Sequence, residues 1–253
     1  MRILVSMGRG GTGKTCFMAM MADYFIRKGE TPLLLVDLDP DQSLGEMIGV
    51  DLETEGKKTI AELVEETFIE KGGTTVGIAP SDRIEETIWR EGMYEGKNLD
   101  FISIGTKWVE GCYCMPDAAL KIALSHLTRQ YRYVIVDAPG GLEHLNRRIT
   151  VKVDDIFDIF GPSSKSFAHI RRARRVADES GVSYNHLYAV GGFLCTKDLQ
   201  TRFSDSEGIR YLGTIAADDE VASRALNGES LLYMDPYSPG PASVSAIMQE
   251  DGY

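Results

Sequence analysis

A glycine-rich segment near the start of the chain constrains the fold most strongly. Residues 8–15 read GRGGTGKT and fit the pattern G-x-x-x-x-G-K-[ST]. They stand between an apolar run at residues 2–6, typical of a short buried strand, and a helical pattern at residues 14–29. Glycines let the backbone wrap tightly, and the amides of a helix start favour negative charge. The segment therefore predicts a phosphate-binding loop, in which Lys14 reaches the β- and γ-phosphates and the Thr15 hydroxyl binds Mg²⁺.

Two later apolar segments end in aspartates, at residues 31–39 and 131–141. The carboxyl ends of parallel strands meet a phosphate loop at one edge of the sheet. Asp39 and Asp137 are therefore expected to hold Mg²⁺ through water or to orient an attacking water. A lone aspartate in such a position is usually a turn residue or a helix cap. The pair, following a phosphate loop, favours the nucleotide site.

Strand-like and helical segments alternate along the whole chain. Further strands are expected at residues 98–105, 154–161, 186–196 and 209–216, and helices at residues 59–73, 116–130, 166–181 and 218–228. This alternation predicts an α/β fold with a doubly wound, mostly parallel sheet flanked by helices. No repeat or linker interrupts the order, so residues 1–253 are expected to form one domain. Residues 50–97 are the least regular and are expected to be a surface insertion, while the tail could close with a short helix.

The charge balance disfavours one class of partner. The formal net charge is −11, from 38 acidic and 27 basic side chains, and such a surface repels nucleic acid. One exception is the run HIRRARR at residues 169–175, which we interpret as the solvated face of a helix. The chain shows no signal peptide and no apolar stretch of about 20 residues. We therefore expect a cytoplasmic protein that binds neither nucleic acid nor membrane.

The four cysteines fall into two kinds. Cys112 and Cys114 lie one residue apart in GCYC, whereas Cys16 and Cys195 lie in apolar segments and are expected to be core residues. Thiols stay reduced in the cytoplasm, so the close pair indicates metal binding or redox chemistry rather than a disulfide. Structural zinc normally needs four ligands, and one chain supplies only two here. A metal site, two buried structural cysteines and a redox pair all remain open on these residues.

With these motifs in view, the sequence resembles the deviant Walker A group of P-loop ATPases. The group includes the nitrogenase iron protein, MinD, ParA, the arsenite-transport ATPase and CooC, the nickel-insertion ATPase of carbon monoxide dehydrogenase. Its loop reads G-K-G-G-x-G-K-[ST], and the extra lysine reaches the nucleotide of the partner subunit in a dimer. Arg9 stands at that place here and preserves the charge on a longer, planar group.

The resemblance extends from residue 1 to about residue 230. DLDPDQSLGEMIGV is similar to the switch I segment of CooC, which implies that Asp39 positions the attacking water. VDAPGGLEHLNRR is similar to the Walker B and switch II segments, with Asp137 near Mg²⁺ and Gly140 or Gly141 sensing the γ-phosphate. His144 in this run is a metal ligand, a γ-phosphate sensor or simply a packed side chain.

The resemblance implies a complete nucleotide site. The expected ATP contacts are Gly8, Arg9, Gly10, Gly11, Thr12, Gly13, Lys14, Thr15, Cys16, Asp137, Gly140 and Thr196. Lys14, Asp39 and Arg9 are the expected catalytic residues, and Thr15, Asp39 and Asp137 the expected Mg²⁺ ligands. Thr196 stands where the family commonly has an asparagine near adenine. The stretch APGG lacks the second cluster cysteine of the iron protein, which argues against a bridging four-iron cluster.

The cysteine pair also has a counterpart in CooC, where a C-x-C is followed by proline and a helix, as in GCYCMPDAALKIAL. In a twofold dimer, two such turns supply four thiolates, which suits Zn²⁺ or Ni²⁺. The resemblance therefore implies an ATP-hydrolysing homodimer that matures a nickel metalloenzyme of the carbon monoxide dehydrogenase or acetyl-CoA synthase type. The alternatives are a positioning ATPase of the ParA or MinD kind and a redox partner like the iron protein.

Overall fold

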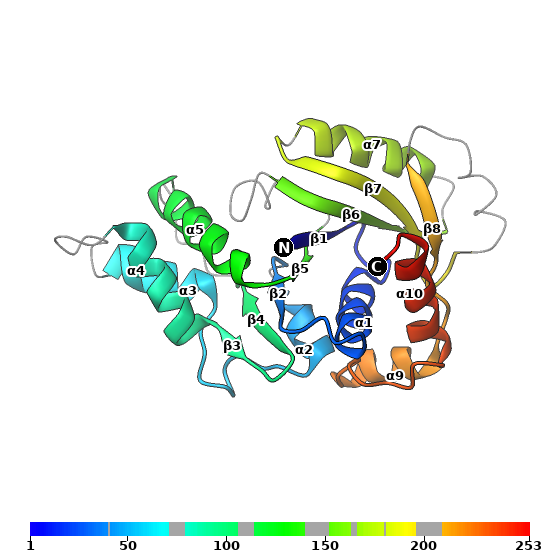
Figure 1. The fold of residues 1–253 in the computed structure, drawn as a ribbon, viewed down its shortest axis with the longest axis horizontal. Coiled ribbons are helices and arrows are strands. Elements are labelled where there is room, and N and C mark those ends of the chain that lie inside the picture. Colours follow the sequence, from blue (N-terminus) through cyan, green and yellow to red (C-terminus); the bar gives the residue numbers. More distant parts are fainter. Residues whose placement is uncertain are drawn as a thin grey trace.

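A twisted sheet of eight strands organises the part of the chain that the computed structural model describes, residues 1–39, 41–70, 79–105, 114–139, 152–162, 166–179, 181–195 and 209–253 (Figure 1). The strands are β1 (Arg2–Met7), β2 (Leu33–Asp37), β3 (Tyr94–Glu95), β4 (Leu99–Ser103), β5 (Tyr133–Asp137), β6 (Lys152–Phe160), β7 (Ser183–Gly191) and β8 (Arg210–Thr214). Their order is β3-β4-β2-β5-β1-β6-β7-β8, and each adjacent pair is parallel except β3 with β4. The predicted α/β fold with a doubly wound, mostly parallel sheet is confirmed.

Helices cover both faces of the sheet because alternate strand residues point to opposite sides. On β1, Ile3 and Val5 belong to one apolar core, and Leu4 belongs to the other. The first core is closed by α3 (Ile60–Val64), α4 (Pro80–Thr87), α5 (Cys114–Leu127) and α7 (Ser166–Glu179). The second is closed by α1 (Lys14–Arg27), α2 (Ser43–Ile48), α9 (Asp219–Asn227) and α10 (Pro239–Glu250). Continuous apolar strands such as β2 are therefore buried on both sides.

The expectation that residues 50–97 form a surface insertion is wrong. Leu63, Ile84 and Ile88 are each 0% exposed and belong to the same core as the central strands. The segment carries this apolar surface on short pieces, namely α3, the π-helix η1 (Glu65–Glu70), α4 and the π-helix η2 (Ile88–Gly92). Helical structure covers residues 60–70 of the helix expected at residues 59–73, whereas the sequence patterns do not predict α4 and η2.

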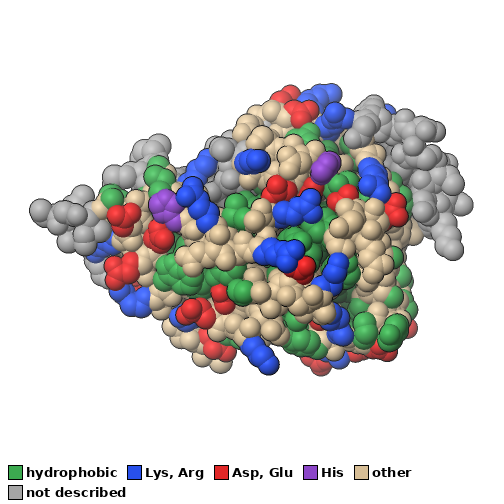
Figure 2. Space-filling view, in the orientation of Figure 1, with side chains coloured by type: hydrophobic (Ala, Val, Ile, Leu, Met, Phe, Trp, Pro, Cys, Tyr) green, Lys and Arg blue, Asp and Glu red, His purple; other side chains and the backbone are tan. Residues whose placement is uncertain are grey.

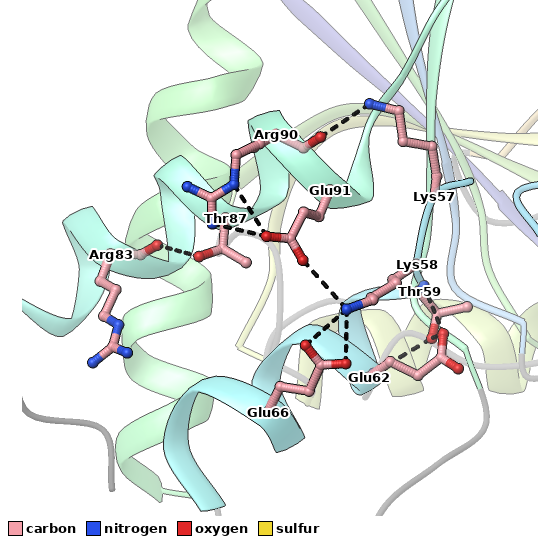
Figure 3. A network of polar contacts seen from close by, with 9 residues as sticks. All are labelled: Lys57, Lys58, Thr59, Glu62, Glu66, Arg83, Thr87, Arg90 and Glu91. Atoms are coloured by element: carbon pink, nitrogen blue, oxygen red, sulfur yellow. Dashed lines mark hydrogen bonds and ion pairs between the residues drawn. The ribbon is translucent and has the colours of Figure 1, made fainter. Parts of the chain in front are cut away.

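Ion pairs join the pieces of this segment on its outer side (Figure 3). The Lys58 ammonium lies 2.9 Å from the Glu66 carboxylate and 3.3 Å from that of Glu91. Lys57 donates to the carbonyl of Arg90 at 3.1 Å. Such half-exposed pairs are screened by solvent and contribute little to stability, so the buried aliphatic side chains hold the segment to the sheet.

Two helices differ in how well the sequence predicts them. The chain closes with α10, which confirms the expected terminal helix and packs against α1 and β8. By contrast, the sequence patterns do not predict α2, a helix of six residues directly after β2. No helix in the described ranges is long and apolar enough to span a membrane.

Candidate nucleotide site

The loop between β1 and α1 has the backbone that its glycines predict. Gly8, Gly11 and Gly13 have φ values of 133°, 74° and 93°, which disfavour other residues. A Cβ atom at Gly8 would collide with the carbonyl of Ile159, and one at Gly13 would lie 2.6 Å from the ring of Phe193. The loop is thus held against the end of β6 and the turn that follows β7.

Lys14 begins α1 and is only 8% exposed. Its ammonium group donates to the carbonyl of Arg9 at 3.2 Å, and the Thr12 hydroxyl donates to the same carbonyl at 2.9 Å. Gly13 precedes the helix and has no side chain to accept hydrogen bonds from the first-turn amides. The ammonium and these amides form the donor set that a phosphate group requires at a helix start. Arg9 itself is exposed on the loop.

Asp137 ends β5 and is 1% exposed. Its carboxylate accepts hydrogen bonds from the Ser6 hydroxyl at 2.6 Å and from the Thr15 hydroxyl at 2.7 Å. Burial raises the pKa of Asp137, while the two hydroxyl donors and the Lys14 charge act in the opposite direction. A hydroxyl beside a buried carboxylate is a donor set that fits Mg²⁺, because this hard cation prefers oxygen ligands.

Asp37 is a site residue that the sequence interpretation missed. It ends β2, lies in register with Asp137 on β5 and is 0% exposed. Its two carboxylate oxygens accept from the amides of Asp39 and Leu44, each at 2.9 Å. Burial and the adjacent Asp137 raise the pKa of Asp37 to about 8. The available signal was its place as the first aspartate of VDLD, directly at the end of the apolar run.

Asp39 follows on the same edge, in the turn between β2 and α2. Its carboxylate accepts from the Asp41 amide at 3.1 Å, and its carbonyl accepts from the Gln42 amide at 3.0 Å. Gln42 has a left-handed backbone, with φ 53°, and its side chain accepts from the Ser103 hydroxyl at 3.3 Å. The segment after β2 is thus bonded to the Asp37 carboxylate through the amides of Asp39 and Leu44. The Asp39 side chain is half-buried beside the site.

Helix α2 also forms one wall of a groove of about 950 Å³. Most charged residues that line this groove are acidic, namely Asp41, Glu46, Asp51, Glu53 and Glu62. The ammonium groups of Lys57 and Lys58 also line it, but they take part in the network of Figure 3. Because the α2 amide of Leu44 is bonded to Asp37, a displacement of the segment after β2 also displaces a wall of the groove.

Cys16 and Cys195 pack against the apolar cores, as expected, although neither is fully buried. Cys16 contacts the core beside α1, and burial together with Asp137 raises its pKa to about 11. Its sulfur is therefore a thiol at neutral pH and a poor metal ligand. Cys195 packs against the opposite core and donates to the carbonyl of Phe160 at 3.2 Å.

Several predicted site residues lie outside the described residues. They are Cys112, Gly140, Gly141, His144 and Thr196. Cys114 is the first residue of α5, but its side chain is not among those described. Among the described residues, no group of three or more His, Cys, Asp and Glu side chains is arranged to hold a metal ion.

The raised pKa of Asp37 predicts a pH dependence of the fold. The folded protein keeps this proton up to about pH 8, whereas the unfolded chain releases it at about pH 4. Raising the pH between these values therefore destabilises the nucleotide-free fold, by at most about 1.4 kcal/mol per pH unit. Asp37→Asn cannot ionise, so its free energy of unfolding should lack this slope in urea denaturation without Mg²⁺. Asp41→Asn, in the same turn but exposed, should keep the wild-type slope, and equal slopes in all three proteins would contradict the assignment.

The loop after β1, with carboxylates at the ends of β2 and β5, defines a P-loop nucleotide-binding protein of the α/β class. Comparison with known proteins narrows the class. The chain belongs to the AAA domain family AAA_31, whose model matches residues 1–160.

Curated relatives and solved structures agree with this family. An uncharacterized ATP-binding protein of Methanocaldococcus jannaschii is 29% identical over 230 residues, covering 89% of this chain and 88% of that one. The carbon monoxide dehydrogenase accessory protein CooC of Rhodospirillum rubrum is 25% identical over 189 residues, covering 72% and 71%. In fold, the chain is similar to a ParA family ATPase from Chlorobium tepidum, with a TM-score of 0.71, 17% identity and coverage of 100% and 99%. It is also similar to the cell division ATPase MinD of Pyrococcus furiosus, with a TM-score of 0.65, 17% identity and coverage of 99% and 98%.

These findings confirm the resemblance to the deviant Walker A P-loop ATPases, with a distant relative among the CooC proteins. By family the chain is an AAA_31 protein, its relatives include ATP-binding proteins, and its fold is similar to that of ParA and MinD ATPases.

Proposed function

We propose that the protein is an ATP-driven homodimer that inserts nickel into an enzyme of the carbon monoxide dehydrogenase or acetyl-CoA synthase type. The observation that carries this proposal is the relationship to a carbon monoxide dehydrogenase accessory protein over 72% of the chain. The Cys112-x-Cys114 pair, at the place where CooC has its C-x-C, supports it.

In the proposed cycle, the first-turn amides of α1 and the Lys14 ammonium bind the triphosphate, and Thr15 and Asp137 hold Mg²⁺. Asp39 orients the attacking water, and Arg9 reaches the nucleotide of the partner subunit. The exposure of Arg9 and the short contacts between Thr15 and Asp137 support these roles. When the γ-phosphate leaves, the segment anchored on Asp37 relaxes and the two subunits move apart.

Nickel is the cargo of this cycle rather than a resident cofactor. Two C-x-C turns across a twofold axis supply four thiolates, which suits tetrahedral zinc or an exchangeable nickel ion. A change in the relative position of the subunits alters the geometry of the four thiolates and so the metal affinity. ATP hydrolysis would then couple to metal release, in the cytoplasm where the client enzyme is assembled.

A positioning ATPase that binds an anionic surface is the second candidate. The observation in its favour is α7, which exposes Arg171, Arg172, Arg174 and Arg175. The formal net charge of −11 counts against it, because a long anionic polymer would be repelled by most of the surface.

Gel filtration combined with metal analysis separates the two candidates. After incubation with NiCl₂ or ZnCl₂ and with a non-hydrolysable ATP analogue, the wild-type protein should elute as a dimer that holds one metal ion. The double variant Cys112→Ser/Cys114→Ser should still form the dimer but lose the metal, while the control Cys195→Ser should keep both. Equal metal content in the double variant and the wild type, or nucleotide-dependent binding to DNA or vesicles without metal, would reject metal insertion.

A further inference from the structure

A second pocket lies at the amino ends of β1, β7 and β8. The phosphate loop follows the carboxyl end of β1, so the two sites lie at opposite ends of the strands. The volume of this pocket is about 340 Å³, and its lining includes Arg2, Arg174, Asn185, His186, Tyr188 and Arg210. These residues come from the amino ends of strands and from α7, so none of them belongs to the nucleotide site. Figure 2 shows basic and acidic side chains interspersed around a histidine over the region of β6 and β7.

Arginines dominate the charge of this pocket. The Arg2 guanidinium stacks on the ring of Tyr253, with its central carbon 4.6 Å from the ring centre. Within the described ranges, this guanidinium makes no hydrogen bond, so its donors are available to a ligand. Three guanidinium groups line this one small cavity, although the formal net charge of the protein is −11.

The acidic groups near the pocket each have a polar partner, and Asp154 accepts from the Asn185 side chain and the Ile3 amide. Asp155, which is 0% exposed, accepts from the Tyr253 hydroxyl and lies 2.6 Å from Nδ1 of His186, its partner in the β6–β7 register. Asp251 accepts from the Tyr188 hydroxyl at 2.5 Å and lies 3.6 Å from the Arg210 guanidinium, which also donates to the Glu250 carboxylate at 3.0 Å.

The contact with Asp155 determines which ring nitrogen of His186 can bind a ligand. Because Asp155 is bonded to Nδ1, the other ring nitrogen of His186 is the one left for a ligand, and the side chain is 55% exposed. The ring also stacks on Tyr188, with centres 5.5 Å apart, which fixes its orientation. Asp155 and Asp251 are thus bonded to tyrosine hydroxyls, and the Arg2 guanidinium and the second ring nitrogen of His186 are the groups left for a ligand.

We propose that this pocket binds a small soluble organic anion through a carboxylate or phosphate group. Guanidinium groups form bidentate hydrogen bonds with these two groups, which makes arginine the preferred residue for both. A cavity of this size suits a small metabolite, and the aromatic side chains of Tyr184 and Tyr188 provide contact area for its body. The residues come from distant parts of the chain, and the pairing of β6 with β7 and of β7 with β8, together with the packing of α7, brings them together.

Calorimetric titration with two probes, inorganic phosphate and benzoate, tests the proposal. At least one probe should bind the wild-type protein saturably at millimolar concentrations or below. Arg2→Gln and Arg210→Gln should each weaken this binding by about tenfold. Arg172→Gln, which removes an equal charge from α7 outside the pocket, should leave it unchanged. Binding should also persist in Lys14→Ala, which excludes the phosphate loop as the site. Melting temperatures verify that each variant is folded.

Three results would overturn the proposal. The first is the absence of saturable binding of either probe to the wild-type protein. The second is an equal loss in Arg172→Gln, which would indicate diffuse surface charge. The third is sedimentation with phosphatidylglycerol vesicles that depends on Arg2 while neither soluble probe binds, which would assign the pocket to a lipid headgroup.

Discussion

Replacing Lys14 with alanine is expected to reduce the rate of ATP hydrolysis by about a thousandfold or more. The ammonium group begins α1, is buried, and lies over the loop carbonyl of Arg9, where the phosphates would bind. Its loss removes a positive charge from a site where burial strengthens electrostatic interactions with the triphosphate. Steady-state release of inorganic phosphate measures the effect.

A matched control separates catalysis from folding. Lys28→Ala removes the same charge after the other end of α1, where the ammonium group lies 5.3 Å from the ring centre of Tyr24. This variant should hydrolyse ATP at the wild-type rate. Within the described residues, the Lys14 ammonium donates only to the Arg9 carbonyl, so the melting temperature of Lys14→Ala should stay close to that of the wild type. A rate within about tenfold of wild type in folded Lys14→Ala would contradict the proposed role.

Asp39→Ala is expected to separate ATP binding from hydrolysis. The carboxylate lies in the turn after β2, beside the buried pair Asp37 and Asp137, and is proposed to orient the attacking water. Its removal should lower the hydrolysis rate by about a hundredfold or more. Affinity for Mg·ATP should change little, because the donors from α1 and the Thr15–Asp137 contact remain. The ATP-bound dimer should therefore persist during gel filtration, whereas the wild-type dimer dissociates as ATP is consumed.

Asp41→Ala is the control for this prediction. Asp41 lies in the same turn and is exposed, and it bonds to Asp39 through its backbone amide, which the substitution retains. It should keep wild-type hydrolysis. If Asp39→Ala hydrolyses ATP at the wild-type rate, or if it loses nucleotide binding as well, the carboxylate has another role and the proposed cycle is wrong at that step.

The sequence predicts β1, the phosphate loop and α1 because short-range sequence patterns determine these elements. The apolar run, the glycines and the helical spacing around residues 2–29 each reflect short-range physics, and β1, the loop and α1 form as expected. The pair of strand-end aspartates is also local information. For this reason the nucleotide edge could be located before any tertiary contact was known.

The missed features depend on tertiary contacts. Asp37 and Asp39 are two residues apart, and only the packed sheet, where Asp37 pairs with Asp137 and is 0% exposed, shows that Asp37 is the buried one. Ser6 is a small polar residue in an apolar strand, and its contact with Asp137 requires β1 to pair with β5. Ile84 and Ile88 enter the core from short helices that the sequence patterns do not predict.

Calorimetric titration of the folded protein with Mg·ATP tests the central claim most directly. The account predicts saturable binding of one nucleotide per subunit, abolished in Lys14→Ala and retained in Lys28→Ala. Absence of any binding heat for Mg·ATP and Mg·ADP with folded wild-type protein, over a range of temperatures, would contradict it.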